Sequence, residues 1–479
     1  MTRSTLLSIS VLLLLCAAAD NQKNLKTIDF STDPNWDSYR NHLLPDPPPK
    51  TKQDFGYRMT NKAGGMKAGE IGGRAQRAAT PAWYAKVIPT KTLNDRLSAS
   101  GKFSVTWDDN GNGILFGFFN ADSRGWRASN SLVFRLDGNG MKYWVLYEYG
   151  TQHWLAGGAG CFEGDAYQTT KTKPFKSDAT SHDWKLEYDP EAANGNGEVT
   201  FTLDGKPWKL ALTDGHKADG ATFNRFGILN QQTTGGSIEA YFDDVTINGE
   251  AENFDQDPKW EAVGNQVEYE DRIRRPYHDY GYSPDTQIAG GKAKGEIGGV
   301  IWRDANPTWY ADKIGPLTLD EEIFASGKIA MTHAGSDGGA SFGFFNAESM
   351  KAEFEAKKKS GFANLLAIHI EGPSRIGHYF SPVFSDAAGE QMAPKEAPIL
   401  RPDSQVHLWS LRYIPQKDGS GQITLTLDEK TQTLTIPQEQ RKANATFDHF
   451  GMFSHSNKGN HIRIFLDDLT YTVARASRP

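Results

Sequence analysis

The chain contains a long internal repeat. Gly69-Glu70-Ile71-Gly72-Gly73 recurs as Gly295-Glu296-Ile297-Gly298-Gly299, an offset of 226 residues (295 − 69). The same offset aligns Trp83-Tyr84 with Trp309-Tyr310, and Gly117-Phe118-Phe119-Asn120 with Gly343-Phe344-Phe345-Asn346. Because this period is far longer than the roughly 20–50 residues of solenoid repeats, each copy must bury its own core. The sequence therefore predicts one type of domain, present twice.

The length of 479 residues suits two domains of a little over 200 residues better than one compact core. We expect a first domain over residues 20–249 and a second over residues 250–479. The joint at Asn248-Gly249-Glu250 is only a few residues long. This favours a pair of domains with limited hinge motion over two domains that move independently on a flexible linker.

Residues 1–19 have the features of a signal peptide. Arg3 precedes the apolar stretch Leu6 to Leu15, and Ala17-Ala18-Ala19 supplies small residues for cleavage. This predicts a secreted, periplasmic or cell-surface protein with no transmembrane helix, because no later stretch has the roughly 18–20 apolar residues required. Lipidation of Cys16 is an alternative, although Leu15 stands where lipoprotein signals want a small residue. If Cys16 is removed, Cys161 is left alone and no internal disulfide can form.

The formal net charge is −7, and no basic cluster is longer than Lys357-Lys358-Lys359. A surface that neutralises nucleic-acid phosphates needs many clustered cations. The composition therefore argues against a nucleic-acid partner.

Both copies show the two-residue period of half-buried strands. Phe103, Val105 and Trp107 alternate with polar neighbours, as do Val199, Phe201 and Leu203. Turn segments such as Asp109-Asn110-Gly111 and Asn194-Gly195-Asn196-Gly197 separate these runs at short intervals. The pattern predicts an all-β chain of two tandem antiparallel β-sandwich (jelly-roll) domains.

Framework motifs carry a resemblance to a known superfamily. Each copy contains Asp-Pro-x-Trp near its start, at Asp33 to Trp36 and at Asp257 to Trp260, and closes with Phe242-Asp243-Asp244 or Leu466-Asp467-Asp468. This frame resembles the concanavalin A-like lectin/glucanase superfamily, which includes laminin-G-like domains, and the segment from Gly-Glu-Ile-Gly-Gly to Phe-Asn-Ala is similar to tandem exported bacterial proteins. The resemblance implies jelly rolls whose first and last strands pair, and a carbohydrate ligand. It leaves open whether the chain is a lectin, a carbohydrate-binding module, a hydrolase, a lyase or a structural domain.

Residues retained in both copies are the first candidates for sugar contacts. They combine carboxylates, guanidinium groups and aromatic rings, which suit hydroxyl groups and the apolar face of a sugar ring. They are Glu70, Arg77, Trp83, Tyr84 and Asn120, with their counterparts Glu296, Arg303, Trp309, Tyr310 and Asn346. The competing interpretation is structural, with Glu70 and Arg77 paired across a hairpin and Trp83 in the core.

Residues that differ between the copies form a second set. The first copy has Arg135 and Tyr147 within an aromatic stretch, one face of which we expect to be open to a ligand or partner. The second has His369 and Glu371 on one strand face, and His378 could approach from the next strand to complete an acid/base or metal set. The alternative for this set is a pair of ordinary solvated side chains.

The spacing Glu187-x-Asp189-x-Glu191 matches that of retaining glucanases, whose catalytic carboxylates share one strand face. Pro190 and the nearby Asn194-Gly195 turn place these residues at a strand end, and the second copy lacks the carboxylates. We interpret the run as turn chemistry.

The closing strands carry Asp pairs. Strand alternation places Asp244 with Phe242 and Asp468 with Leu466, on the apolar side, where each carboxylate needs a partner. Backbone or Arg pairing is one interpretation, and a structural calcium, with oxygens from Asp29 or Asp255, is the other. No other cofactor is indicated.

Two functional hypotheses remain. The first is an exported polysaccharide- or oligosaccharide-binding protein whose two lectin-like modules engage one chain. The second is a polysaccharide-active enzyme, a hydrolase or lyase, with one catalytic copy and one binding copy. A third possibility is a structural role at the cell surface, which no separate sequence motif indicates.

Overall fold

The computed structural model describes residues 24–475, except residues 162–172, 253, 274–276, 305, 336, 356–361, 373–377, 395 and 455–458. The predicted signal peptide and Cys16 lie outside the described residues. The described part is almost entirely β-structure in antiparallel sheets, which confirms the predicted fold class. Its helices are short: α1 (His216–Asp219), α2 (Ala347–Glu355) and α3 (Gln438–Arg441). None of the described helices is long and apolar enough to cross a membrane.

The first sandwich packs an open sheet against a covered sheet. The open sheet runs in the order β15 (Lys206–Ala211), β14 (Glu198–Leu203), β13 (Ser181–Asp189), β7 (Leu97–Asp108), β17 (Ser237–Ile247), β5 (Glu70–Gln76), β4 (Lys50–Arg58) and β20 (Gln266–Glu270), with β18 (Glu250–Glu252) also paired to β17. The covered sheet runs β11 (Ala156–Gly160), β10 (Lys142–Gly150), β9 (Ser131–Gly138), β8 (Ile114–Phe119), β16 (Thr222–Asn230), β6 (Trp83–Thr92) and β19 (Glu261–Val263), with β12 (Phe175–Lys176) on β10.

The second sandwich has the same strand order, position by position. Its open sheet runs β32 (Lys430–Ile436), β31 (Gly421–Leu427), β30 (His407–Pro415), β24 (Ile323–Ala334), β34 (His461–Thr472), β22 (Glu296–Trp302), β21 (His278–Ser283) and β3 (His42–Leu43), with β1 (Leu25–Ile28) on β34. Its covered sheet runs β28 (Gln391–Met392), β27 (His378–Ser385), β26 (Leu365–Glu371), β25 (Gly339–Phe345), β33 (Thr446–Ser454), β23 (Trp309–Thr318) and β2 (Asp37–Tyr39), with β29 (Ile399–Leu400) on β27.

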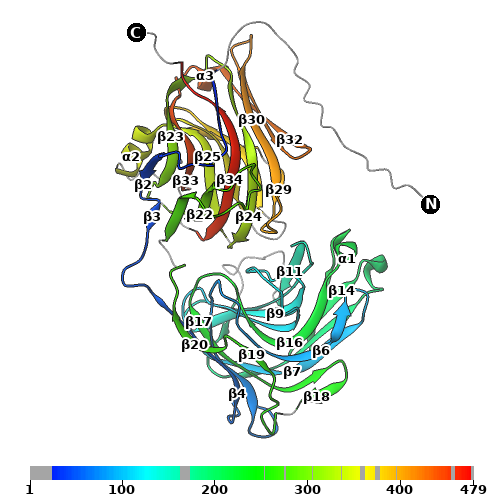
Figure 1. Cartoon of the computed structure of the whole chain (residues 1–479). Helices are drawn as coiled ribbons and strands as arrows, with labels where there is room; N and C mark the ends of the chain where they lie inside the picture. The colour runs from blue at the N-terminus through cyan, green and yellow to red at the C-terminus, as the bar shows by residue number, and fades with distance from the viewer. Residues whose placement is uncertain are drawn as a thin grey trace, which may run out of the picture.

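The N-terminal strands belong to the second sandwich, not to the first. β1 pairs with β34, β2 with β23 and β3 with β21, and Figure 1 shows the blue β2 and β3 within the upper body. The first sandwich is continuous over residues 50–270, whereas the second combines residues 25–43 with residues 278–472. Strand pairing therefore divides the chain differently from the expected boundary between residues 249 and 250.

A two-residue hairpin accounts for this division. Asn248 and Gly249 join β17 to β18 with φ values of 48° and 89°, and Ile247 pairs with Glu250. Two successive positive φ values suit Asn-Gly and give a tight hairpin of the type that matches strand twist. β18 is therefore held on β17, and the strands that follow it, β19 and β20, complete the first sandwich. The second sandwich is closed by the equivalent strands at the N-terminus.

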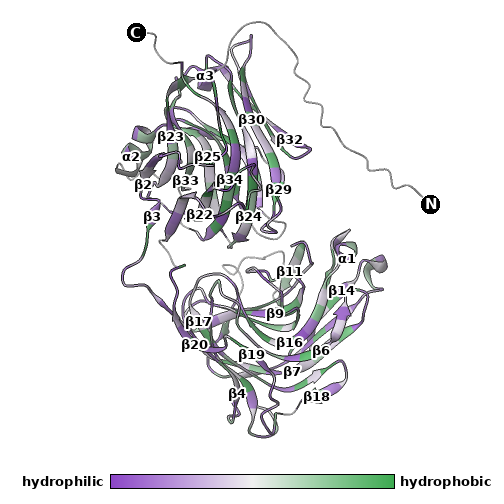
Figure 2. Ribbon diagram, viewed as in Figure 1, coloured by the Kyte–Doolittle hydropathy of each residue, from purple (hydrophilic) through white to green (hydrophobic). Residues whose placement is uncertain are grey.

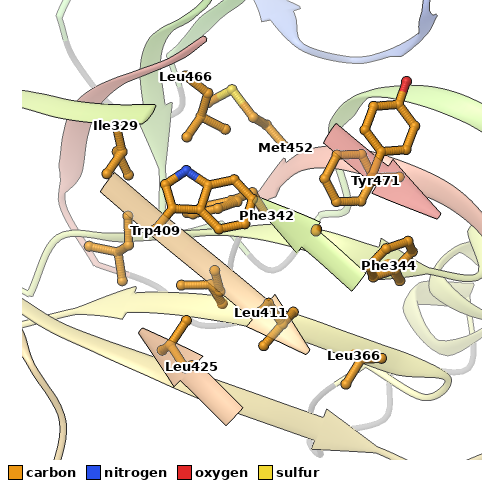
Figure 3. Close-up of a cluster of buried hydrophobic side chains, with 14 of the residues drawn as sticks. Ile329, Phe342, Phe344, Leu366, Trp409, Leu411, Leu425, Met452, Leu466 and Tyr471 are labelled. Carbon is orange, nitrogen blue, oxygen red and sulfur yellow. The ribbon is translucent and has the colours of Figure 1, made fainter. Parts of the chain in front are cut away.

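The open sheets have one buried face and one face toward solvent. Along β13, Trp184, Leu186 and Tyr188 are buried, whereas Asp183 and Lys185 point outward. Figure 2 shows the resulting mixture of hydrophilic and hydrophobic positions along the strands. In the second sandwich the buried faces meet around Trp409, Phe342 and Leu466, which Figure 3 shows packed together. The predicted alternation therefore places both cores correctly.

The covered sheets are buried on both faces. Outer-face residues Trp83, Leu115 and Phe119 pack with Ala128 from the segment that follows β8. In the second sandwich, Met350 of α2 packs against the equivalent Trp309 and its neighbours. This covering overturns the expectation that one aromatic face of residues 143–149 is open, because Trp144 is buried on the outer face and Tyr147 lies in the core.

Candidate functional site

The retained tryptophans are hydrogen-bonded to strands that close the sandwiches. In the first sandwich, Trp83 donates its indole N–H to the carboxylate of Glu261 in β19 at 2.9 Å, and Arg225 binds both oxygens of that carboxylate. In the second, Trp309 donates to Asp37 in β2 at 2.8 Å. Both rings are nearly buried. Trp83 and Trp309 therefore fasten β19 and β2 to their sheets.

The carboxylate that receives Trp309 is kept charged. Burial alone would raise the pKa of Asp37, but the hydrogen bonds from Trp309 and Lys313 outweigh it and lower the pKa. Lys313 lies 3.2 Å from Asp37, and the ring of His449 lies 3.6 Å from it. The hydrogen bond that fastens β2 thus has a charged acceptor at neutral pH.

The neighbouring tyrosines bind the Asp-Pro-x-Trp motifs. Tyr84 donates its hydroxyl to Asp257 at 3.1 Å and stacks on Trp260, with 5.9 Å between ring centroids. Tyr310 has the same arrangement, its hydroxyl 3.4 Å from Asp33 and its ring 5.7 Å from that of Trp36. The two retained motifs are therefore each other's partners, and Tyr84 and Tyr310 face the core.

Glu70 and Glu296 occupy matching buried positions. Glu70 accepts the backbone N–H groups of Lys62 and Ala63 at 2.9 and 2.7 Å. Glu296 accepts those of Ile288 and Ala289 at the same two distances. Each carboxylate is fully buried beneath the loop that precedes its strand. Both residues hold a loop in place and are closed to a ligand.

A second buried carboxylate lies near each of these glutamates. Burial, together with the negative charge of Asp244 and Glu70, raises the pKa of Asp243 to about 7. Asp467 matches it, with a pKa of about 7 raised mainly by burial. The Oδ2 atoms of the two residues lie against Gly65 and Gly291, where a Cβ atom would come within 1.9 and 1.7 Å. A side chain at either position would force the buried carboxylate of Asp243 or Asp467 to move.

The orientation predicted for the Asp pairs is wrong. Asp243 and Asp467 are the buried members, while Asp244 and Asp468 are half-buried. The cause is a β-bulge, because Asp244 and Asp468 adopt φ values near 50° and the pairing register shifts beside them. Asp468 forms an ion pair with Lys328 at 2.9 Å. Among the described residues, no cluster of three His, Cys, Asp or Glu side chains could hold a metal ion.

Arg77 and Arg135 belong to a buried ionic cluster on the outer face of the covered sheet. Arg77 pairs with Asp137 at 2.8 Å, and Arg135 lies between Asp137 at 3.3 Å and Glu148 at 3.6 Å. Arg127 approaches Glu148 to 3.5 Å. The ion-pair partner of Arg77 is therefore Asp137. It is not Glu70, the partner that the structural interpretation predicts. Burial lowers the pKa of Arg77, and Asp137 partly offsets this.

The catalytic candidates of the second sandwich do not converge. Arg303 binds Glu371 at 3.2 Å, and the ring of His369 lies 3.2 Å from the hydroxyl of Ser341. Glu371 pairs with Tyr379 in the ladder, so His378, one residue earlier, leaves its strand on the other face. Burial lowers the pKa of His369 to about 3 and that of His378 to about 4. The expected acid/base set is not assembled, and these imidazoles are weak bases.

Asn120 and Asn346 act as loop caps. Asn120 donates to Thr222 at 2.9 Å and accepts the backbone N–H of Asp122. Asn346 lies 3.4 Å from Thr446 and accepts the backbone N–H of Ser349. These hydrogen bonds give both amides partners within the protein.

A narrow cavity lies where the two sandwiches meet. Trp126 and Trp154 line it from the first sandwich, and His378 and Pro402 from the second. Its volume of about 20 Å³ admits a molecule the size of water, not a sugar ring.

A spacious polar groove lies on the outer face of the first open sheet. Its volume is about 550 Å³. Ser98 of β7, Glu187 and Asp189 of β13, and Thr200 of β14 lie along it. The other lining residues are Arg96, Leu97, Tyr188, Ala192, Glu198, Lys209 and Asn248. We call this the cross-strand groove, because it extends over β15, β14, β13, β7 and the end of β17.

Every carboxylate of the cross-strand groove has a cation beside it. Glu187 lies 2.7 Å from Lys185, Asp189 lies 2.7 Å from Arg96, and Glu198 lies 2.6 Å from Lys209. The backbone N–H of Glu191, followed by the Arg96 contact, lowers the pKa of Asp189 against a small effect of burial. That backbone bond confirms turn chemistry at the end of β13. The groove thus alternates hydrogen-bond donors and acceptors.

The second sandwich lacks this chemistry at the matching positions. Strand registers place Phe324 where the first sandwich has Ser98, Arg412 at Glu187, Ile414 at Asp189 and Gln422 at Glu198. Arg412 pairs instead with Glu322 at 2.6 Å. The cross-strand groove is therefore a property of the first sandwich. Sequence reasoning noticed Glu187 and Asp189 by their spacing but had no signal for the other strands that complete the groove.

No protein-family model matches the chain, and no curated protein matches it. Similar solved structures include domains LG4-5 of the mouse laminin α1 chain, at 10% identity over 85% of this chain and 95% of that one, with a TM-score of 0.24. The alginate lyase of a Chlorella virus has 13% identity over 42% and 90%, with a TM-score of 0.26. The seed lectin of Lotus tetragonolobus has 10% identity over 41% and 94%, with a TM-score of 0.24. At identities of 10–13%, the activities of these proteins are not carried over to this chain.

Proposed function

We propose that this protein is an exported carbohydrate-binding protein and that the cross-strand groove of its first sandwich holds the sugar. The observation that carries this proposal is the set of polar side chains along a cavity of about 550 Å³. Sugar hydroxyls both donate and accept hydrogen bonds, so a site with paired cations and carboxylates can bind neighbouring hydroxyls of one ring. Ser98, Thr200 and Asn248 add neutral hydrogen-bonding groups between the charges.

Binding without cleavage fits this groove better than hydrolysis. A glycosidase needs one carboxylic acid with a raised pKa facing a second carboxylate. Glu187, Asp189 and Glu198 are each neutralised by a cation, and the pKa of Asp189 is lowered. The proposal assigns the sugar site to the first sandwich alone. The two-module hypothesis needs a site in each sandwich, but the matching face of the second carries Arg412 and Ile414.

A polysaccharide panel tests the proposal. The purified mature chain is passed over immobilised starch, xyloglucan, galactomannan, laminarin, alginate and polygalacturonate, and both retention and newly formed reducing or unsaturated ends are recorded. We expect retention on at least one polymer without new ends. Thr200→Leu, which replaces a hydroxyl on the groove floor by a branched apolar group, should weaken retention at least tenfold.

The second sandwich supplies a matched control. Thr424 lies at the position of Thr200, so Thr424→Leu makes the same change outside the groove and should leave retention unaltered. Equal loss in both variants, or no retention on any polymer, would overturn the proposal. New ends formed by the wild type would favour the alternative of a polysaccharide-active enzyme.

A further inference from the structure

The cross-strand groove has no excess of positive charge. Its lining carries three carboxylates, Glu187, Asp189 and Glu198, and two cations, Arg96 and Lys209, while Lys185 pairs with Glu187 from outside the lining. A site for a carboxylated or sulfated polymer needs cations in excess, because each anionic group of the ligand must be neutralised when it leaves water. The groove offers no such excess, and the chain as a whole carries a net charge of −7, which repels polyanions.

The groove also runs across the strands instead of along one of them. Its lining comes from β15, β14, β13, β7 and the residue after β17, which are consecutive neighbours in the open sheet. Strands lie ~4.8 Å apart, so this row extends for ~19 Å. Such a length suits several linked sugar units and exceeds what a single ring would occupy.

The lining is more polar than apolar and does not suit a peptide or lipid. Leu97 and Tyr188 are core residues beneath the groove, and the side chains on its face are charged, hydroxyl-bearing or amide-bearing apart from Ala192. A peptide or lipid ligand would want an apolar anchor in a pocket. A polymer dense in hydroxyl groups matches this lining instead.

From these three features we infer that the ligand of the cross-strand groove is an uncharged, extended polysaccharide chain. The inference rests on the proposed carbohydrate-binding function and adds the class of polymer. The paired ions bind hydroxyl groups of successive sugar rings, with each carboxylate accepting and each cation donating. Because the polymer is uncharged and the groove has no excess of cations, binding releases few counterions. The affinity should therefore depend little on the salt concentration.

The test compares polymers that differ only in charge. Dextran, laminarin, galactomannan and xyloglucan are each presented beside their own carboxymethylated derivative, and affinity electrophoresis gives the dissociation constant at low and high salt. We expect at least one neutral polymer to bind at least tenfold more tightly than its carboxymethylated form, with less than a threefold change between salt concentrations.

A charge-reversal variant sharpens the comparison. Glu187→Lys leaves the groove with an excess of cations and should reduce or remove the preference for the neutral form. Arg412→Glu, at the matching position of the second sandwich, is the control and should preserve the preference of the wild type.

The outcomes separate the inference from the function on which it rests. Tighter binding of the carboxymethylated form, or equal binding of both, overturns the neutral class and leaves carbohydrate binding intact. Binding of no polymer in either form overturns both. An unchanged preference in Glu187→Lys also overturns the inference, because the groove charges would then not select the ligand.

Discussion

Trp309 donates its indole N–H to Asp37 at 2.8 Å, although the two residues lie 272 positions apart. The equivalent bond, from Trp83 to Glu261, lies entirely within residues 50–270. The same contact is thus made by a continuous chain in one sandwich and by the N-terminus in the other. The second sandwich is complete only when residues 25–43 return to it.

Replacing Trp36 by Ala should destabilise the second sandwich. Trp36 packs against Phe30, Tyr310 and Tyr471, and loss of a buried Trp side chain costs about 3–5 kcal/mol. Limited proteolysis, with cleavage sites identified by mass spectrometry, should show new cuts in residues 278–472 and none in residues 50–270. Trp260→Ala is the matched control and should have the opposite pattern. New cuts of Trp36→Ala in the first sandwich would contradict the strand pairing described above.

Asp243→Asn should stabilise the protein more at pH 8 than at pH 5. The pKa of this carboxyl is about 7 in the folded chain and ~3.9 when unfolded, so the folded state binds a proton between these values. Stability from that proton is complete below the unfolded pKa and is lost as pH rises through 7. Asparagine stays neutral at both pH values, so its stabilising effect should be about 1–3 kcal/mol larger at pH 8 than at pH 5. Urea unfolding at the two pH values measures the difference, and an equal shift at both would contradict it.

Acid should unfold the second sandwich before the first. Burial lowers the pKa of His333 and His378 to about 4, of His369 to about 3, and of His461 well below its usual value. Unfolded histidines titrate near ~6.5, so the unfolded state binds more protons as pH falls from there to about 4, and stability is lost over this window. Asp243 and Asp467 contribute alike to the two sandwiches and do not change their order. Calorimetry from pH 7 to pH 4.5 measures the unfolding temperature of each sandwich, with the two transitions assigned by Trp36→Ala and Trp260→Ala. The unfolding temperature of the second sandwich should fall faster as the pH is lowered. A faster fall for the first sandwich would contradict this prediction.

Glu371→Gln should leave polysaccharide retention unchanged. The substitution removes the charge that faces Arg303 at 3.2 Å, which should cost about 1–3 kcal/mol in the second sandwich, remote from the cross-strand groove. Retention on the panel and urea unfolding are measured on the same preparation. Release of new ends by the wild type that disappears in Glu371→Gln would instead place catalysis at the second sandwich.

Local sequence patterns were enough to predict the β-sandwich architecture. They did not predict which strands complete each sandwich. Alternation such as Val199, Phe201 and Leu203 depends on one strand and its two faces, and it identified both cores. The partner of residues 25–43 is a long-range choice between two sandwiches with the same strand order. The Asn248-Gly249 hairpin holds β18 on β17, and the same Asn-Gly signal is also compatible with a domain joint.

The candidate site was less predictable than the fold. Trp83, Tyr84 and Glu70 recur in the second copy because the same hydrogen bonds hold both sandwiches together, and repetition alone cannot separate that role from ligand binding. The cross-strand groove depends on residues from five strands, of which only Glu187 and Asp189 form a local pattern. The sequence shows that Arg412 and Ile414 replace these two residues in the second copy. The cavity could be recognised only once the neighbouring strands of the sheet were known.

Hydrogen exchange of the wild-type chain with and without a retained neutral polysaccharide is the most direct test of where the ligand lies. Ligand in the cross-strand groove should slow exchange in peptides that cover residues 96–98, 187–200 and 206–211, and should leave their counterparts in the second sandwich, residues 322–324, 412–424 and 430–435, unaffected. Slowed exchange confined to the second sandwich or to the covered sheets, with residues 187–200 unchanged, would contradict the assignment of the groove.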